Sequence, residues 1–294
     1  MTPPALDGVE HRYVTTRDGV RIHVACAGPD DGPPVMLVHG FPQHWWAWHR
    51  QIGPLAADGY RVLVPDLRGA GWSDAPRGPY AKADMAEDLA AVLDQLHVGP
   101  VTVAAHDWGG PVAMILVLRH PGKVSGFVGF NTVAPWLRLG WPLARHLWAF
   151  FYQYPLLLPG IGPRLIGRRG QRYLRWVARW VGGGYALPEA DTRLYLERMR
   201  DPARAAAGSR WYRTFQAREA LAWLRGAHTG SRVSVPLRFV TGTKDPVITP
   251  ALHDGYRAHA EDITFEHVDD VGHWIVDQAP DLVLDRIRAL LPER

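Results

Sequence analysis

"VTVAAHDWGG", residues 101–110, places a carboxylate where a strand is expected to turn into a helix. Its first five residues are small or β-branched, as in a strand buried on both faces of a sheet. Two glycines follow, and Pro111 comes next, which suits a first helical turn because its missing N–H needs no partner there. The stretch therefore predicts a strand, a tight turn that holds Asp107, and a helix.

The rest of the chain repeats this alternation of strands and helices. Helical patterns cover residues 80–97, 109–120 and 279–291. Strand-to-helix alternation predicts an α/β fold, with a mostly parallel sheet and helices on both faces. The turn at Arg17-Asp18-Gly19 adds an antiparallel hairpin at one edge. The strand-like runs are residues 20–28, 34–40, 60–66, 101–107, 124–130, 236–245 and 263–270.

The alternation is interrupted once, in the second half of the chain. Residues 135–230 are rich in Trp, Arg, Leu and Tyr and contain no convincing strand pattern. We therefore expect a core domain built from residues 1–134 and 231–294, with residues 135–230 inserted as a helical cap.

The positive charge of the chain is almost entirely arginine. The 294 residues carry a formal net charge of +4, and Lys82, Lys123 and Lys244 are the only lysines. Many arginines lie between Arg138 and Arg225, where they would suit an acidic partner or an anionic surface. The simpler interpretation, a solvated arginine-rich surface, is the one that the sequence alone favours. No signature of a nucleic-acid-binding module is present.

Neither a disulfide nor a targeting segment is expected. Cys26 stands alone in a strand-like run and is interpreted as a buried small side chain. The first twelve residues lack the pattern of a signal peptide. Prolines interrupt the most apolar stretch, residues 148–162, which is too short to span a bilayer. The sequence thus predicts a cytoplasmic protein without a membrane span.

Two further patterns predict no bound group. The glycines of "GAGWSD", residues 69–74, lack the full dinucleotide fingerprint, and no cofactor is expected. His39, His44 and His49 are close in sequence but have no carboxylate at ligand spacing, and no metal is expected. The nearby tryptophans 45, 46 and 48 are interpreted as helix packing.

Asp107 has two possible roles in its turn. Small residues stand two positions before it and two after it, Ala105 and Gly109, as in the tight strand-to-helix turn that exposes a nucleophile. Alternatively, Asp107 could simply cap the following helix.

Residues elsewhere favour the nucleophile. Asp245 ends the strand that resumes after the insertion, and His273 follows the last strand, which gives the order nucleophile, acid, histidine. Carboxyl ends of strands are where open α/β sheets bind ligands. After "LVHGFPQ", residues 37–43, the N–H groups of Phe41 and Trp108 would form an oxyanion hole.

These stretches resemble the α/β-hydrolase superfamily, and specifically its epoxide hydrolase branch. The matching pieces are "HGFPQHWWAW" (39–48), "DLRGAGWSD" (66–74), "HDWGG" (106–110), "GTKDPV" (242–247) and "GHW" (272–274). The resemblance runs from about residue 10 to 290 and implies the α/β-hydrolase fold with a helical cap. It also implies an aspartate nucleophile that forms an alkyl ester, which water then hydrolyses.

The resemblance further implies that two cap tyrosines protonate the epoxide oxygen. "RWYRTF" matches the family's element around Tyr212, and "FFYQYP" resembles the other, with Tyr152 preferred and Tyr154 as a rival. Either ring could instead serve only in packing. The expected substrate is a small, mostly apolar epoxide, which water converts to a vicinal diol.

Two other functions stay open at this point. A haloalkane dehalogenase would use the same nucleophile with indole N–H groups around a halide, from Trp108 and one of Trp136, Trp141 or Trp176. Phe41 counts against this reading, because those enzymes often carry a polar residue there. A ligand-binding protein without catalysis is the third function, and the complete triad argues against it.

Overall fold

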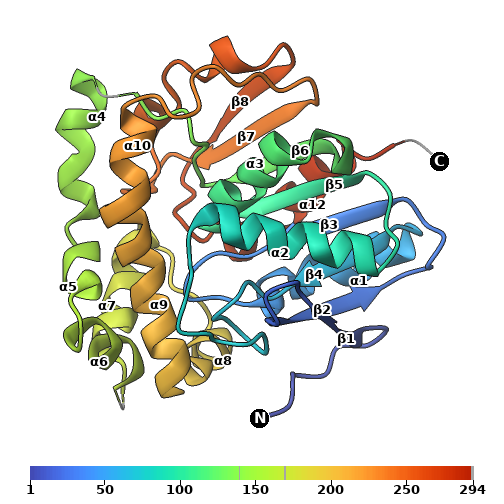
Figure 1. The fold of residues 1–294 in the computed structure, drawn as a ribbon, viewed down its shortest axis with the longest axis horizontal. Helices are drawn as coiled ribbons and strands as arrows, with labels where there is room; N and C mark the ends of the chain where they lie inside the picture. Colours follow the sequence, from blue (N-terminus) through green and yellow to red (C-terminus); the bar gives the residue numbers. More distant parts are fainter. Residues whose placement is uncertain (139, 169, 293–294) are drawn as a thin grey trace.

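One eight-stranded sheet runs through the molecule (Figure 1). The fold comes from a computed structural model, which describes residues 1–138, 140–168 and 170–292. The strand order is β1-β2-β4-β3-β5-β6-β7-β8; β2 is antiparallel to both of its neighbours, and all other pairs are parallel. The strands are β1 Glu10–Thr15, β2 Arg21–Ala27, β3 Pro34–Val38, β4 Arg61–Pro65, β5 Val101–His106, β6 Val124–Phe130, β7 Leu237–Gly242 and β8 Ile263–Val268. The predicted α/β fold, its hairpin edge included, is confirmed.

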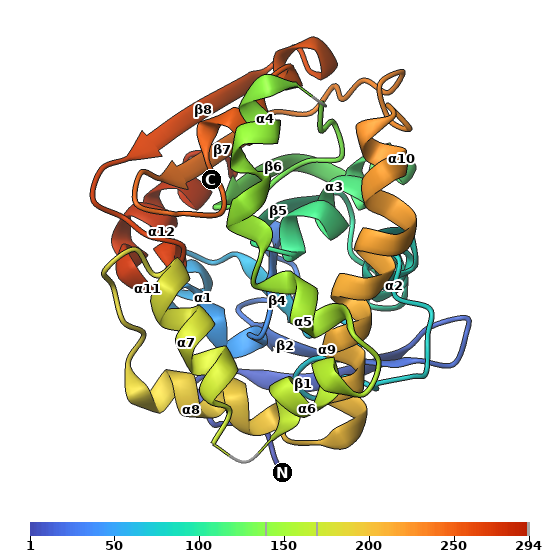
Figure 2. The same cartoon turned by 90° about the vertical axis from the view of Figure 1, so that its left-hand side faces the viewer.

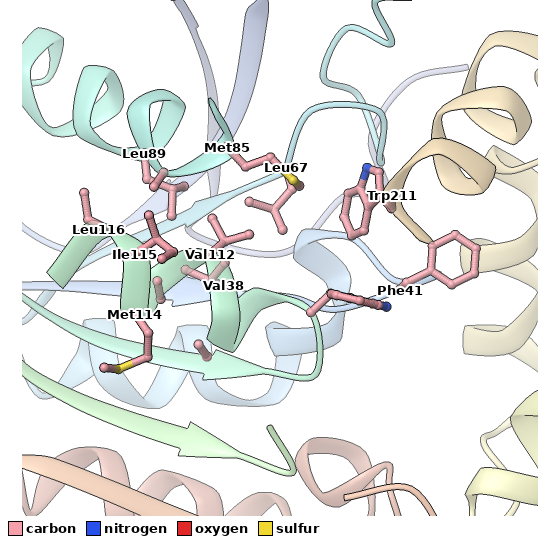
Figure 3. Close-up of a cluster of buried hydrophobic side chains, with 14 of the residues drawn as sticks. Val38, Phe41, Leu67, Met85, Leu89, Val112, Met114, Ile115, Leu116 and Trp211 are labelled. Atoms are coloured by element: carbon pink, nitrogen blue, oxygen red, sulfur yellow. The ribbon is translucent and has the colours of Figure 1, made fainter. Parts of the chain in front are cut away.

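Helices cover both faces of the sheet because successive strand residues point to opposite sides. Met36 and Val38 of β3 pack on the side of α2 and α3, whereas Val35 and Leu37 pack on the side of α1 and α12. Figure 3 shows the first of these layers, with α2 and α3 side chains over Val38. These helices are α1 His49–Ala57, α2 Lys82–Gln95, α3 Gly109–Arg119, α11 Ile275–Gln278 and α12 Pro280–Arg288.

Short 3₁₀ helices occupy several connections around the sheet. The first of them contains Trp45 and Trp48, which are completely buried against the sheet, so this cluster serves packing. These 3₁₀ helices are η1 Trp45–Trp48, η2 Pro121–Lys123, η5 Pro250–His253 and η6 Tyr256–His259.

Only helices and loops occur between β6 and β7 among the described residues, apart from one isolated bridge between Val233 and Ala260. These helices gather on one side of the sheet (Figures 1 and 2) and are called the helical insertion below. They are α4 Trp141–His146, η3 Leu147–Phe150, α5 Gln153–Leu157, α6 Ile161–Gly167, α7 Arg172–Val181, α8 Glu189–Arg198, α9 Pro202–Thr214, the π-helix η4 Phe215–Glu219 and α10 Ala220–Leu224.

Helices α8 and α9 attach the insertion to loops of the core. Arg198 and Arg204 both donate hydrogen bonds to the carbonyl of Gly71, and the indole N–H of Trp211 donates to the carbonyl of Arg68 at 3.1 Å. Figure 3 shows Phe41 and Trp211 at this junction. The helices from α4 to α7 lie farther from these core loops than α9 does (Figure 2).

Candidate active site

Asp107 lies in the turn between β5 and α3, with backbone φ of +47°, in the left-handed region that side chains rarely adopt. The turn brings it close to the end of β3. A Cβ atom on Gly109 would come within 2.6 Å of the Val38 and His39 carbonyl oxygens, and one on Gly40 would collide with the Asp107 side chain. The strained, tightly packed turn explains why small residues surround Asp107 in the sequence.

Two backbone N–H groups converge on the Asp107 carboxylate. The N–H of Phe41 donates to Oδ2 at 2.8 Å, and the N–H of Trp108 also hydrogen-bonds this carboxylate. They are the two groups expected from the sequence to form an oxyanion hole. The Asp107 carboxylate therefore lies in a site suited to negative charge.

His273 lies between the two carboxylates. Its Nδ1 is 2.7 Å from Oδ2 of Asp245, and its Nε2 is 3.7 Å from Oδ1 of Asp107. Asp245 follows β7 and His273 follows β8, so the parallel strands deliver both side chains to one edge of the sheet. This arrangement can hold a histidine that accepts a proton beside Asp107.

Asp245 is held by groups that the sequence analysis did not single out. Its Oδ1 accepts the N–H groups of Val247 and Ile248, and the Asn131 side chain donates to Oδ2 at 2.7 Å. Asn131 also donates to the carbonyl of Gly272. It directly follows β6, so a polar residue after a buried strand was the signal that could have identified it.

Burial and charge act on the site in opposite directions. Burial raises the pKa of Asp107, against the effects of His273 and the two N–H groups. Burial also disfavours the charged form of His273, but the charges of Asp245 and Asp107 outweigh it and raise the pKa of that imidazole. The two carboxylates therefore stabilise an imidazolium at this position.

Two tyrosines from the insertion are buried around Asp107. Tyr152 precedes α5, and Tyr212 lies in the last turn of α9; both are less than a tenth exposed. Tyr154, the rival of Tyr152, is 57% exposed and lies outside the site. Burial raises the pKa of both buried phenols, and the charge of Asp107 raises it further, so both keep their protons at neutral pH.

Each of these hydroxyl oxygens has a hydrogen-bond partner that the sequence analysis missed or assigned differently. Gln153 donates to the Tyr152 hydroxyl at 3.2 Å and accepts a hydrogen bond from Gln216 at 2.9 Å. The Trp108 side chain hydrogen-bonds Tyr212. Because the amide and the indole N–H are donors, each hydroxyl proton is free to point elsewhere.

A buried lysine adds a positive charge beside this indole. Lys82 lies 4.5 Å above the Trp108 ring, and its ammonium is 3.7 Å from Glu219. Burial lowers the pKa of Lys82 to about 8. Glu219 and Gln216 both belong to the π-helix η4, so this short element reaches toward both tyrosines. π-Helical turns are frequent at functional sites.

Two cavities meet at Asp107. The larger, about 130 Å³, is lined mainly by apolar side chains of α3, the insertion and the loop after β7. The smaller, about 30 Å³, includes His273, Tyr212 and Phe41. Asp107 and Tyr152 line both of them.

The tryptophans considered for halide binding do not meet at the nucleophile. Trp136 is buried, and its N–H donates to Ser231 at 3.2 Å, while Trp141 and Trp176 are exposed. None of these three lines either cavity. Of the four tryptophans considered, Trp108 is the one that lines a cavity, with its side chain engaged by Tyr212.

Comparisons with known proteins identify the family of the chain. A sequence model of the family described as "alpha/beta hydrolase fold" matches residues 33–280. The chain belongs to that family. Within this α/β-hydrolase family, it falls in the epoxide hydrolase branch, whose members recur among its relatives and structural neighbours.

Three matches illustrate the relationship. The chain is 30% identical to "AB hydrolase superfamily protein YfhM" of Bacillus subtilis, over 95% of this chain and 96% of the relative. It is also 30% identical to "Epoxide hydrolase A" of Mycobacterium tuberculosis, over 92% of this chain and 93% of the relative. The crystal structure of epoxide hydrolase VrEH1 from Vigna radiata superposes with a TM-score of 0.82 at 26% identity, over 98% of both chains.

Proposed function

We propose that this α/β hydrolase converts epoxides to vicinal diols through a covalent ester on Asp107. One observation carries the proposal: a carboxylate on a nucleophile turn shares its cavities with a buried, protonated tyrosine, while a second tyrosine walls the smaller cavity. Displacement at saturated carbon needs the carboxylate, and epoxide opening needs an acid at the ring oxygen. Relatives and neighbours that are named epoxide hydrolases support the same reaction.

In the first step, Oδ1 of Asp107 attacks an epoxide carbon. Oδ2 stays with the N–H of Phe41, and the N–H of Trp108 also holds the carboxylate, which keeps it oriented. The carbon–oxygen bond of the ring breaks as the ester bond forms, and the ring oxygen takes a proton from Tyr152 or Tyr212. The raised pKa of both phenols keeps that proton available at neutral pH.

In the second step, water attacks the carbonyl carbon of the ester. His273 removes a proton from the water, and Asp245 stabilises the imidazolium that forms. The carbonyl oxygen, now Oδ2, becomes an oxyanion between the same two N–H groups. Breaking of the ester bond releases the diol, whose leaving alkoxide takes the proton held by His273. The carboxylic acid formed at Asp107 then loses its proton through solvent to the tyrosinate, which restores both residues.

We propose that the helical insertion, for which boundaries of 135–230 are expected, acts in this scheme as a cap. It supplies both tyrosines and most of the wall of the larger cavity. The difference in cavity size favours an epoxide with one extended apolar substituent and a small substituent on the other side. No cofactor or metal takes part in either step.

A substrate screen tests the proposal. The purified protein is incubated with aryl and aliphatic epoxides beside bromoalkanes and chloroalkanes of similar size, and the products are identified. We expect vicinal diols from the epoxides and little halide release. Halide release without diol formation would replace this proposal with a haloalkane dehalogenase.

A further inference from the structure

Many large apolar side chains of the helical insertion are exposed to solvent. Among the described residues, eleven large apolar side chains are exposed, and eight of them lie between residues 141 and 176, each 41% to 75% exposed. Five of the eight are aromatic: Trp141, Trp148, Phe151, Tyr154 and Trp176. Figure 2 looks onto this side of the molecule, with α4 to α7 in front. Such a concentration marks an interaction surface.

The patch continues from one helix to the next. Phe151 lies 5.9 Å from Trp176, measured between ring centroids, which joins the start of α5 to α7. Leu147, Leu158 and Ile161 extend it along η3 and toward α6. Phe151 and Trp176 therefore adjoin, and the other exposed apolar residues lie on the neighbouring helices of the same segment.

The segment that carries this surface is positively charged and has no acidic residue of its own to compensate the charge. No acidic residue occurs between Asp107 and Glu189, whereas eight arginines lie between Arg138 and Arg179. On α7, Arg172, Trp176 and Arg179 are exposed along one side of the helix. In the part of this run that the structure describes, Arg175 forms an ion pair, with Glu189 at 2.9 Å, and the other arginines form none within 4.0 Å.

We propose that this aromatic–arginine face, the exposed apolar and arginine residues of the segment 138–179, docks the protein on an anionic membrane surface. Aromatic side chains favour the boundary between lipid headgroups and acyl chains. Arginines keep their guanidinium groups among anionic headgroups while their stems lie along apolar surface. The docking is peripheral, since no helix of the described residues is long and apolar enough to cross a bilayer.

Charge decides against the simplest alternative, a second copy of the chain. Pairing of two such faces would bring both sets of arginines together, and the segment offers no acidic side chain to separate them. An anionic bilayer neutralises the arginines and accepts the aromatic rings without needing a matching shape.

The face also touches the larger cavity. Leu147 is 43% exposed on the face and lines that cavity, and Leu143 and Phe150 of the same segment line it too. Docking would therefore bring the cavity wall to the lipid, where apolar substrates accumulate. This consequence rests on the proposed function, whereas the docking itself does not.

Vesicle flotation tests the docking. The full-length protein is mixed with vesicles of phosphatidylcholine alone or with one third phosphatidylglycerol, at low and at high salt. We expect binding to the anionic vesicles that salt weakens. Arg172→Glu with Arg179→Glu should lower the partition constant by at least about 30-fold, the effect of losing two arginine contacts. Trp141→Ala with Trp148→Ala should lower it roughly tenfold or more.

Two controls match these variants. Arg17→Glu with Arg77→Glu changes the net charge equally, at exposed arginines of the core, and Leu221→Ala removes an exposed apolar side chain from α10. Both should bind like the unmodified protein. Equal losses in the arginine control would overturn the proposal, and so would the absence of vesicle binding.

Sedimentation velocity covers the remaining alternative. Self-association that the Arg172 and Arg179 variant abolishes, without vesicle binding, would assign the face to a second copy and overturn the membrane proposal. Flotation uses no enzymatic readout. If the epoxide screen fails while flotation succeeds, only substrate delivery is lost.

Discussion

The core and the helical insertion position their reactive groups by different means. Core groups follow strand ends, and backbone groups hold them: Asp107 accepts the Phe41 N–H, and Asp245 accepts those of Val247 and Ile248. The insertion's tyrosines are held through side chains, Tyr152 by Gln153 and Tyr212 by Trp108. Under the proposed function, the core would carry both covalent steps and the insertion would serve only the first.

The largest effect is expected at the group that both steps need. Asp107→Ala should lower turnover by at least about 10⁴-fold, because no ester can form. A single turnover of the unmodified protein in heavy-oxygen water should place label in the Asp107 carboxylate, detected in the peptide that contains it. Label in the diol alone would mean direct attack by water and would remove the ester from both steps.

His273→Gln should separate the two steps, since it removes the base for ester hydrolysis and leaves the tyrosines intact. Turnover should fall by on the order of 10³-fold or more. The ester should accumulate as a mass increase on the intact protein equal to one substrate. Full steady-state turnover by this variant would exclude His273 from the second step.

Tyr152→Phe with Tyr212→Phe should affect only the first step. Loss of acid assistance typically costs on the order of 10² to 10⁴-fold, and each single variant should lose less, because the other phenol remains. Stopped-flow measurements should show slow alkylation with unchanged hydrolysis of the ester. Unchanged epoxide opening in the double variant would contradict the epoxide assignment at its most specific point.

A smaller effect is expected where one side chain orients another. Gln153→Ala removes the donor to the Tyr152 hydroxyl, and we expect alkylation to slow by roughly tenfold, the value of about one hydrogen bond. In a Tyr152→Phe background the same change should have little further effect. Equal losses in both backgrounds would mean that Gln153 serves packing alone.

The smallest expected change is in pH dependence. His273 must be neutral to accept a proton, so ester hydrolysis should slow as pH falls through the pKa of this imidazole, which the charges of Asp245 and Asp107 raise in the free protein. Esterification removes the charge of Asp107, which leaves Asp245 as the main cause. Asp245→Asn should therefore shift the acidic fall in the rate of ester hydrolysis to lower pH, and it should also lower the maximal rate. A fall at the same pH in both proteins would show that Asp245 does not set the pKa of His273.

The same contrast explains what the sequence could predict. Asp107, Asp245 and His273 stand at strand ends, and the alternation of strands and helices was enough to bring them to one edge of the sheet. Phe41 and Trp108 followed from the turn that each occupies. Groups held by their own backbone leave a local pattern in the sequence.

The supporting residues of the insertion leave no such pattern. Gln153 and Gln216 are 63 positions apart and meet only because α5 packs against the helix that contains η4. Lys82 reaches Glu219 over 137 positions, from the first turn of α2. These partners depend on how short helices pack, which side-chain periodicity does not determine. The cap boundaries and the roles of the site residues stay predictions until the variants above are measured.

The π-helix has a consequence for how relatives of this chain could diverge. Helices α9, η4 and α10 run without a break from Pro202 to Leu224, and a π-turn holds one more residue than an α-helical turn. Deletion of Ala217 would restore ordinary winding while the helix after it kept nearly the same orientation, because a π-turn takes up its extra residue locally. Ala220 and Leu224 would keep their places in the wall of the larger cavity, whereas Gln216 and Glu219, inside the π-turn, would change direction. A loss or gain of one codon would then change how Gln153 and Lys82 are held without moving the wall, and a series of epoxides of increasing chain length would record slower alkylation in the same order of preference.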